Sequence, residues 1–387
     1  MIAVEEPFTN PAIAPLPAMK SAPETPLYEA ALLIDLIGGG APQPAPSTNW
    51  NLLRHIATEN GVLAHAFQSL VASGTSIPDS FAKSARDSEA ANMRLAMELH
   101  SLLALFARHN IDVLPLKGPA LSLALYGDAS MRSSNDLDLL VRRKDFSRAE
   151  ALLVSQSFLP AGPLAGYHKP FSRGALLVEL HLDLSEKCYL PLDMESIWSR
   201  AQTTEFCGQP TCVMSREDLA LYLCCHGSKH RFSRLIWTLD FAQSIQGWST
   251  SEYESLLSLA ERHDLAPWLF LACAVLRAIF PHRLPDALDA ILSSSAINKR
   301  AECTVARMFS GDAKTGINDY RGLYLQIEPS PWKRLRYIAG YFALSPYDRK
   351  WASSHHIPTA LMFALRPFRI IERHGIRRAF HTFFPQK

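Results

Sequence analysis

The sequence predicts an α+β fold, in which a small mixed-sheet core is inserted between mainly helical N-terminal and C-terminal regions. Apolar residues recur every three or four positions from Trp50 to His109, which is the period of a helix, and helical patterning returns after Pro191. Between these regions, short apolar runs alternate with helical segments, as in a compact layered core. We therefore expect a flexible lead (1–26), a helical N-terminal region (27–109), the core (110–190), a helical domain (191–345) and a basic C-terminal segment (346–387).

The core divides into strands and helices in a fixed order. "IDVLPL", from Ile111, predicts a strand, "KGPALSLALYG" a turn and a helix, and "NDLDLLV" a second strand. "DFSRAEALLVSQSF" predicts a helix, and "ALLVELHLDL" (175–184) a third strand. Beyond Pro191 we expect helices.

Length and composition predict a soluble globular protein with a sizeable core. The 387 residues are 48% apolar and 20% charged, and a net charge of +2 gives no global argument for nucleic acid or a membrane surface as partner. Seven cysteines without a CxxC pair, among them Cys224 and Cys225 in an apolar helical stretch, indicate reduced core thiols. The N-terminus lacks the pattern of a secretory signal, and the longest apolar segment, Leu265 to Phe280, is shorter than the roughly 20 residues that span a bilayer. We expect no membrane span and a cytoplasmic location.

The second predicted strand carries two carboxylates in an apolar run, "MRSSNDLDLLV". Asp136 and Asp138 are two positions apart, so both point to one face of the strand while Leu137, Leu139 and Val141 point to the other. Two like charges side by side repel each other unless a cation lies between them. The alternative is an edge strand whose polar face is in water.

The third predicted strand repeats this pattern. Glu179 and His181 share one face, and Val178, Leu180 and Leu182 share the other. If the two strands are neighbours, Glu179 converges with Asp136 and Asp138. Three carboxylates form a hard oxygen site suited to Mg²⁺, which is commonly completed by water and substrate phosphates. The alternative for His181 is a core histidine with satisfied hydrogen bonds.

The turn after the first strand offers positive partners for phosphate. Gly118 permits a tight turn and Pro119 fits the first helical position, so the helix begins just after Lys117. The free amides of a helix N-terminus, together with one lysine, suit a triphosphate. Arg132, four residues before Asp136, is placed to bind a phosphate bidentately. As an alternative, Lys117 and Arg132 are surface charges.

The order of strand, glycine turn, helix, DxD strand, helix and acid-bearing strand resembles the DNA polymerase beta-like nucleotidyltransferase superfamily. More closely, "LPLKGPALSLALYGDASMRSSNDLDLLV", "LLVELHLDL" and "HGSKHRFSRLIWTLDFA" are similar to a bacterial family of uncharacterised nucleotidyltransferases. The resemblance implies a nucleotidyltransferase core with Asp136 and Asp138 as metal ligands and Glu179 as the third carboxylate. It also implies that Lys117 and Gly118 lie near the triphosphate.

The turn departs from the superfamily pattern. Superfamily members usually carry serine or glycine after the turn glycine, and the serine touches phosphate, whereas here Pro119 follows Gly118. Lys117, Ser133 and Ser134 are the candidates to replace that hydroxyl.

The segment "HGSKH" places His226 and His230 four residues apart on one face of a predicted helix, with Lys229 beside them. Such a pair can bind zinc, but no HExxH glutamate accompanies it and no third ligand is identifiable. We expect these residues to pack against the core or to line the cleft where acceptor or nucleotide enters, by similarity to the family. We expect Asp240, in "WTLDFA", to be a buried acid paired with a basic neighbour.

The C-terminal segment is basic, with five arginines near scattered phenylalanines. This run suits RNA, an acidic peptide or phosphate, but it lacks the regular aromatic spacing of a stacking platform. A solvated helix face is our default interpretation. The arginines are Arg366, Arg369, Arg373, Arg377 and Arg378.

Together these features predict a Mg²⁺-dependent enzyme that transfers a nucleoside monophosphate from a nucleoside triphosphate, ATP by expectation, to an acceptor hydroxyl on a small molecule, peptide or protein. Glu179 completes the metal site or takes the acceptor's proton. The alternatives are a catalytically silent nucleotide-binding scaffold and a phosphotransferase that uses the same metal site. Nucleic acid is not an expected partner. The residues expected to contact the nucleotide are Lys117, Gly118, Arg132, Ser134, His181, Lys229 and His230.

Overall fold

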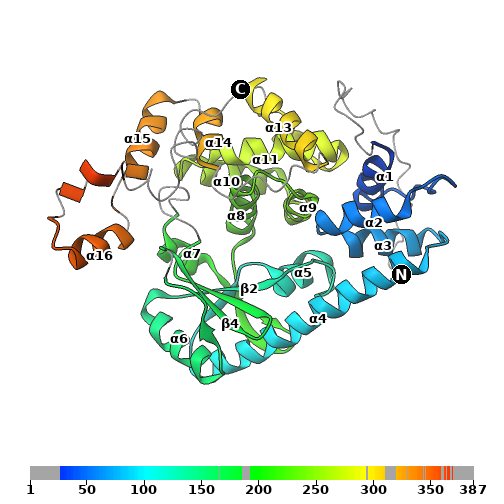
Figure 1. Ribbon diagram of the computed structural model, residues 1–387. Coiled ribbons are helices and arrows are strands. Elements are labelled where there is room, and N and C mark those ends of the chain that lie inside the picture. Colours follow the sequence, from blue (N-terminus) through cyan, green and yellow to red (C-terminus); the bar gives the residue numbers. More distant parts are fainter. Residues whose placement is uncertain are drawn as a thin grey trace.

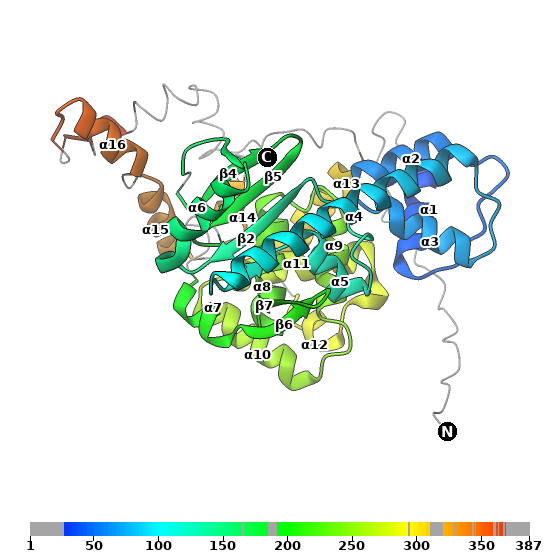
Figure 2. The ribbon, with the colours of Figure 1, turned by 90° about the horizontal axis from the view of Figure 1, so that it is seen from below.

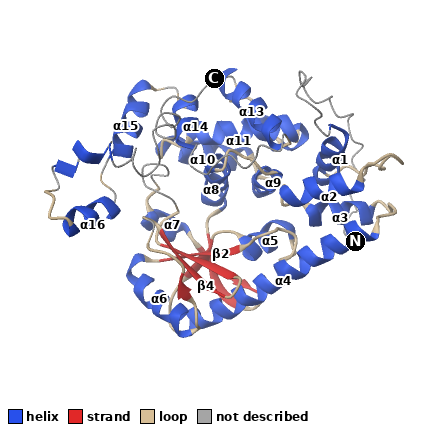
Figure 3. Cartoon of the chain, viewed as in Figure 1, coloured by secondary structure: helices blue, strands red, loops and turns tan. Residues whose placement is uncertain are grey.

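The computed structural model describes residues 27–164, 166–184, 192–292, 295–309, 320–328 and 330–342, and shorter stretches up to residue 368. Helices surround a single five-stranded mixed sheet in this part of the chain, which confirms the predicted fold class (Figure 1, Figure 3). The predicted lead (1–26) lies outside the described residues, as do the last four of the five C-terminal arginines.

The described elements follow the predicted order through the core and add strands to it. The N-terminal helices are α1 (Leu27–Gly38), α2 (Trp50–Glu59), α3 (Leu63–Ala72) and α4 (Asp79–Arg108). The core holds β1 (Val113–Pro115), α5 (Gly118–Tyr126), β2 (Asp136–Val141), η1 (Arg143–Asp145), α6 (Phe146–Ser155), β3 (Leu159–Pro160), β4 (His168–Arg173) and β5 (Leu176–His181). Beyond it lie α7 (Met194–Arg200), β6 (Gln202–Phe206), β7 (Gln209–Val213), α8 (Arg216–Lys229), α9 (Leu235–Ser244), α10 (Thr250–Arg262), α11 (Ala266–Ile279), η2 (Pro281–Arg283), α12 (Asp286–Asp289), α13 (Ser295–Met308), α14 (Tyr320–Ile327), α15 (Pro331–Phe342) and α16 (Pro346–Ser354).

The sheet has the strand order β1-β2-β5-β4-β3, and its central pair, β2 and β5, is parallel while the other pairs are antiparallel. A parallel pair needs a crossover connection, and here the chain runs from β2 through α6, β3 and β4 before it enters β5. The register sets Asp138 opposite Glu179, so the predicted adjacency of the two acid-bearing strands is correct.

Two hairpins were not predicted. In the first, β4 pairs with β5 through a two-residue turn at Gly174, whose φ of +59° suits glycine. In the second, β6 and β7 join through Cys207 and Gly208, which both have positive φ, as a type I′ turn requires. The expectation of helices alone beyond Pro191 is therefore wrong for the β6–β7 hairpin, which lies against β1 through the bond from Thr211 Oγ1 to the carbonyl of Val113.

The sheet has one apolar and one polar face. The apolar face packs on α4 and α6, where Leu137, Leu139 and Leu180 are buried with Leu103 and Leu153. Figure 2 shows α4 crossing in front of the sheet and continuing to α1–α3. At 30 residues, α4 is about 45 Å long, so one helix contacts both the sheet and the N-terminal helices.

The opposite face of the sheet carries the acids and looks toward α8 and α9 (Figure 1). Ser215 is the N-cap of α8, and its hydroxyl accepts from the backbone N–H of Asp218. Helix α8 packs on α9, α10 and α11. Cys224 and Cys225 are buried in this helix, as predicted for core residues. No helix in the described part of the chain is long and apolar enough to cross a membrane.

Candidate active site

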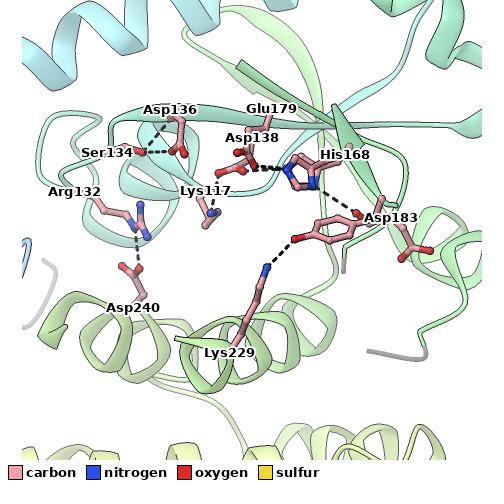
Figure 4. A network of polar contacts seen from close by, with 12 residues as sticks. Lys117, Arg132, Ser134, Asp136, Asp138, His168, Glu179, Asp183, Lys229 and Asp240 are labelled. Atoms are coloured by element: carbon pink, nitrogen blue, oxygen red, sulfur yellow. Dashed lines mark hydrogen bonds and ion pairs between the residues drawn. The ribbon is translucent and has the colours of Figure 1, made fainter. Parts of the chain in front are cut away.

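Asp138 and Glu179 face each other across the parallel strands β2 and β5. Asp138 is 3% exposed and Glu179 is half-buried. Asp136 begins β2 on the same face, and its carboxyl is half-buried. Figure 4 shows the three carboxylates on this face of the sheet, with Asp138 and Glu179 close together and Asp136 set apart beside Ser134.

One histidine nitrogen joins two of these acids. Nε2 of His181 lies 3.0 Å from Oδ1 of Asp138 and 3.5 Å from Oε2 of Glu179. Oxygens of Asp138 and Glu179 and a ring nitrogen of His181 all lie within 4.8 Å of one another, so the three side chains could hold a metal ion. Asp136 lies outside this compact group, but its carboxyl is close enough for the charges of Asp138 and Glu179 to raise its pKa.

Lys117 completes the surroundings of Asp138. Its Nζ lies 2.9 Å from Oδ2 of Asp138, and the lysine side chain is 16% exposed. The backbone places it there: the N–H of Leu116 donates to the carbonyl of Asp138 at 3.0 Å, and Lys117 then caps α5. Lys117, which was predicted to contact phosphate, therefore forms an ion pair with Asp138, which was predicted to be a metal ligand.

Neighbouring groups and burial shift the pKa values of Asp138 and Asp136 in opposite directions. Burial alone would raise the pKa of Asp138, but the Lys117 ammonium and the hydrogen bond with His181 outweigh it and hold the pKa well below its usual range. Burial raises the pKa of Asp136, and the charge of Asp138 adds to the rise. Such a split separates a permanent carboxylate from one that can take up a proton.

Glu179 and His181 shift together. The hydrogen bond from His181 lowers the pKa of Glu179 despite its partial burial. Burial alone would lower the pKa of His181, but its bonds to Asp138 and Glu179 raise it. The two carboxylates and the protonated form of His181 therefore stabilise one another, and the same two anions would stabilise a metal ion bound in place of the ring proton.

The turn residues lie directly against the start of β2. Gly118 has a φ of +66°, and a Cβ there would lie 3.6 Å from the carbonyl oxygen of Asp136 and from Oγ of Ser134. The Ser134 hydroxyl donates to that carbonyl at 3.1 Å, and Ser133 pairs with Ser88 at 3.3 Å. Pro119 takes a first-turn position of α5, as predicted.

Arg132 lies in a buried ion pair. Its Nε donates to Oδ2 of Asp240 at 2.8 Å, and the hydroxyl of Tyr126 donates to the other oxygen at 2.7 Å. Arg132 is 5% exposed and Asp240 is fully buried. The prediction that Asp240 pairs with a basic neighbour is confirmed, and Asp240, in α9, rather than a phosphate, is the partner that the structure gives Arg132 (Figure 4).

Lys229 reaches from the end of α8 toward the sheet. Its Nζ donates to the hydroxyl of Tyr167 at 2.7 Å (Figure 4). His168, the next residue, stacks on His181 with ring centroids 5.2 Å apart, and its Nε2 lies 3.7 Å from Oε2 of Glu179. Tyr167 and His168 were not among the predicted site residues. They would have been found only by recognising strand β4, where His168 pairs with His181.

His230 packs against aromatic neighbours. Its ring stacks on Trp237 at 4.9 Å and lies 4.7 Å from the ring of His226. Burial lowers the pKa of His230 to about 3 and that of His226 well below its usual value, so both rings are neutral near pH 7. Neither belongs to the group of possible metal ligands found among the described residues. Of the two expected roles for His226 and His230, this geometry favours packing over contact with nucleotide or acceptor.

A cavity of about 560 Å³ lies beside α5, between β1, the β6–β7 hairpin and the first turn of α8. Its walls include Leu121, Phe206 and Met214, with Glu205 and Gln243 among the polar groups. None of the predicted site residues lines it, so it is separate from the acids.

A parallel strand pair with facing carboxylates, placed beside a glycine turn that opens a helix, defines an enzyme core suited to handling phosphates. The chain belongs to the family of uncharacterised nucleotidyltransferases, which matches its residues 46–281. The predicted family is thus confirmed, and the protein is an enzyme of the nucleotidyltransferase class.

Comparisons with other proteins add little beyond the family. A search of the curated proteins finds no match. The solution structure of the antibiotic-resistance factor ANT(2'')-Ia is 15% identical, with 45% of this chain and 95% of that chain covered and a TM-score of 0.35. The crystal structure of an antigenic nucleotidyltransferase-like protein from Paracoccidioides brasiliensis is 20% identical, with 52% and 95% covered and a TM-score of 0.31. We draw no argument from these two similarities.

Proposed function

We propose that this enzyme transfers a nucleoside monophosphate from a nucleoside triphosphate to an acceptor hydroxyl, with Mg²⁺ held by Asp136, Asp138 and Glu179. The observation that carries the proposal is the position of Asp138 opposite Glu179, beside the turn of Lys117 and Gly118. ATP is the donor that we expect. The acceptor class is a small molecule, a peptide or a protein.

The chemistry of the donor set fits a hard divalent cation. Carboxylate oxygens are the ligands that Mg²⁺ prefers, and Asp138 and Glu179 supply them within one compact group. Mn²⁺ shares this preference for carboxylate oxygens, so the same group would also suit Mn²⁺. When bound, such an ion supplies positive charge that offsets the phosphates and stabilises the departing pyrophosphate.

The chain's own residues would bind and orient the nucleotide. The free amides at the start of α5 suit anionic oxygens, and Gly118, lacking a side chain, lets a phosphate approach the backbone. Lys117, beside Asp138, and Lys229, bonded to Tyr167, add positive charge between the acids and α8 (Figure 4). These two charges would hold the triphosphate against the polar face of the sheet.

Glu179 is our candidate for the proton acceptor. The pKa of Glu179 is lowered, so its carboxylate is deprotonated near pH 7, and it is more exposed than Asp138. A general base must lie within hydrogen-bond reach of the hydroxyl that it deprotonates. Glu179 would meet this requirement if the acceptor enters from the exposed side of β5.

A transfer assay tests the proposal. The full chain is incubated with Mg²⁺, each of the four nucleoside triphosphates labelled at the α-phosphate, and pooled acceptors, and the products are read by mass. The proposal predicts an adduct of one nucleoside monophosphate, lost in Asp138→Asn and kept in Asp87→Asn, which changes an exposed ion pair on α4. An adduct of one phosphate would instead assign the phosphotransferase, and nucleotide binding without any adduct would favour the silent scaffold.

A further inference from the structure

Each carboxylate oxygen of Asp138 faces one basic side chain. Nε2 of His181 lies 3.0 Å from Oδ1, and Nζ of Lys117 lies 2.9 Å from Oδ2. The Asp138 side chain is 2% exposed, so water does not compete for either oxygen. A cation that binds Asp138 through Oδ2 would therefore lie next to the lysine ammonium, which carries a like charge.

A change of partner by Lys117 would involve its side chain and not its backbone. The backbone on either side of Lys117 is fixed by the bond from Leu116 N–H to the carbonyl of Asp138 and by the turn at Gly118. The lysine stem is long and has rotatable bonds, so its ammonium can change partner without a change in the fold.

Among the residues that the structure describes, none offers Lys117 a second anion away from the acids. The residues of α8 that are near enough to affect its charge or to be affected by it are Tyr222, His226 and His230, and burial keeps these three neutral near pH 7. Asp136, on the same face of the sheet, is the other acid that faces it. A triphosphate seated at the start of α5 would bring a new anion to the lysine, since Lys117 occupies the N-cap position of this helix.

We propose that Lys117 couples metal binding to triphosphate binding, by holding Asp138 until the triphosphate arrives and then moving to the phosphates, which frees Oδ2 for the metal ion. The inference rests on the proposed function and deepens it, because it makes the metal–triphosphate complex, rather than the free ion, the species that the site accepts. A free divalent ion would meet the ammonium as a like charge beside the same carboxylate, and would bind weakly.

Opposite effects on two ligands are the signature of this coupling. Without the lysine, the site keeps its three carboxylates and loses a competing cation, so free metal binds more tightly. The triphosphate alone loses a positive partner and binds more weakly. A loss of structure would weaken both, so it cannot produce this pair of changes.

The test uses the full chain and two separate titrations. Free Mn²⁺ is measured by electron paramagnetic resonance as protein is added, and the α,β-methylene analogues of the four nucleoside triphosphates are titrated one by one in the presence of EDTA. For Lys117→Met we expect Mn²⁺ affinity to rise about tenfold and affinity for the preferred analogue to fall about tenfold, the ordinary size of a coupling between sites. Lys117→Gln, whose side chain keeps a polar end, repeats the test should the methionine variant fail to fold.

Lys229→Met is the matched control. It removes a lysine from the same site whose ammonium bonds the neutral hydroxyl of Tyr167 rather than an acid, so Mn²⁺ affinity should stay within about twofold of the wild type. If wild-type protein binds both ligands but the Lys117 variants bind Mn²⁺ no more tightly, the coupling is refuted and the proposed function stands. If wild-type protein binds neither Mn²⁺ nor any analogue, even when both are supplied together, both proposals fail.

Discussion

Replacing Asp240 with asparagine removes the negative charge from the buried link between the core and α9. Arg132 would stay 5% exposed, with a neutral amide in place of the carboxylate that now lies 2.8 Å from its Nε. Removing one partner of a buried ion pair leaves an uncompensated charge and costs about 3–5 kcal/mol. Tyr126→Phe removes only the 2.7 Å hydrogen bond to the same carboxylate, which costs about 1.5–3 kcal/mol.

Urea unfolding of the full chain measures these differences in the free energy of unfolding. The expected order of loss is Asp240→Asn first and Tyr126→Phe second, with the exposed-pair control Asp87→Asn within about 1 kcal/mol of the wild type. A triple variant that combines Arg132→Met, Asp240→Leu and Tyr126→Phe removes every polar group of this link at once, and should lose less stability than Asp240→Asn alone. Equal stability of Asp240→Asn and Asp87→Asn would refute the assignment of this ion pair as a buried structural link.

Two further changes probe the turn and the N-terminal helices. Gly118→Ala should cost about 1 kcal/mol for a side chain at positive φ and should also weaken binding of the triphosphate analogue, whereas Gly127→Ala, at a similar φ of +73° with open space around it, should cost as much without affecting that binding. Burial lowers the pKa of His65 from its ordinary 6.5 to about 4, so its neutral form is favoured in the folded state, and the stability that this contributes is present above pH 6.5 and lost as the pH falls toward 4. Urea midpoints of His65→Gln should therefore decline less than those of the wild type between these pH values, while the exposed-site change His55→Gln should follow the wild type; parallel curves for His65→Gln and wild type would contradict this account.

The parts of the site that follow from local sequence were predictable. Alternation along β2 and β5 places Asp136 and Asp138 on one face and Glu179 on a matching one, and the Gly-Pro pair marks the start of α5. These features depend on residues a few positions apart, where strand and helix periods hold. Only the choice of β2 and β5 as neighbours required the resemblance to a known fold.

The parts that were missed depend on contacts between distant segments. The sequence shows that Arg132 lies four residues before Asp136. It does not show that the Arg132 guanidinium pairs with Asp240, 108 residues later. Strand β4 lacks clear alternation and contains Pro170, so His168 and its neighbour Tyr167 were not assigned to the sheet. The sequence indicated that Lys117 and Asp138 belong to the site. Their ion pair was not predicted, because it depends on how the turn packs on β2.

The claim that Asp138 and Glu179 gather a divalent ion against a polyphosphate is tested most directly by calorimetry. The Mg²⁺ complex of the preferred α,β-methylene nucleotide is titrated into wild-type protein, Asp138→Asn, Glu179→Gln and the control Asp87→Asn. The account predicts tight binding to wild type and control, and at least a tenfold loss in each of the two site variants, because each removes one carboxylate from the group. Equal affinity of all four proteins for the complex would contradict it.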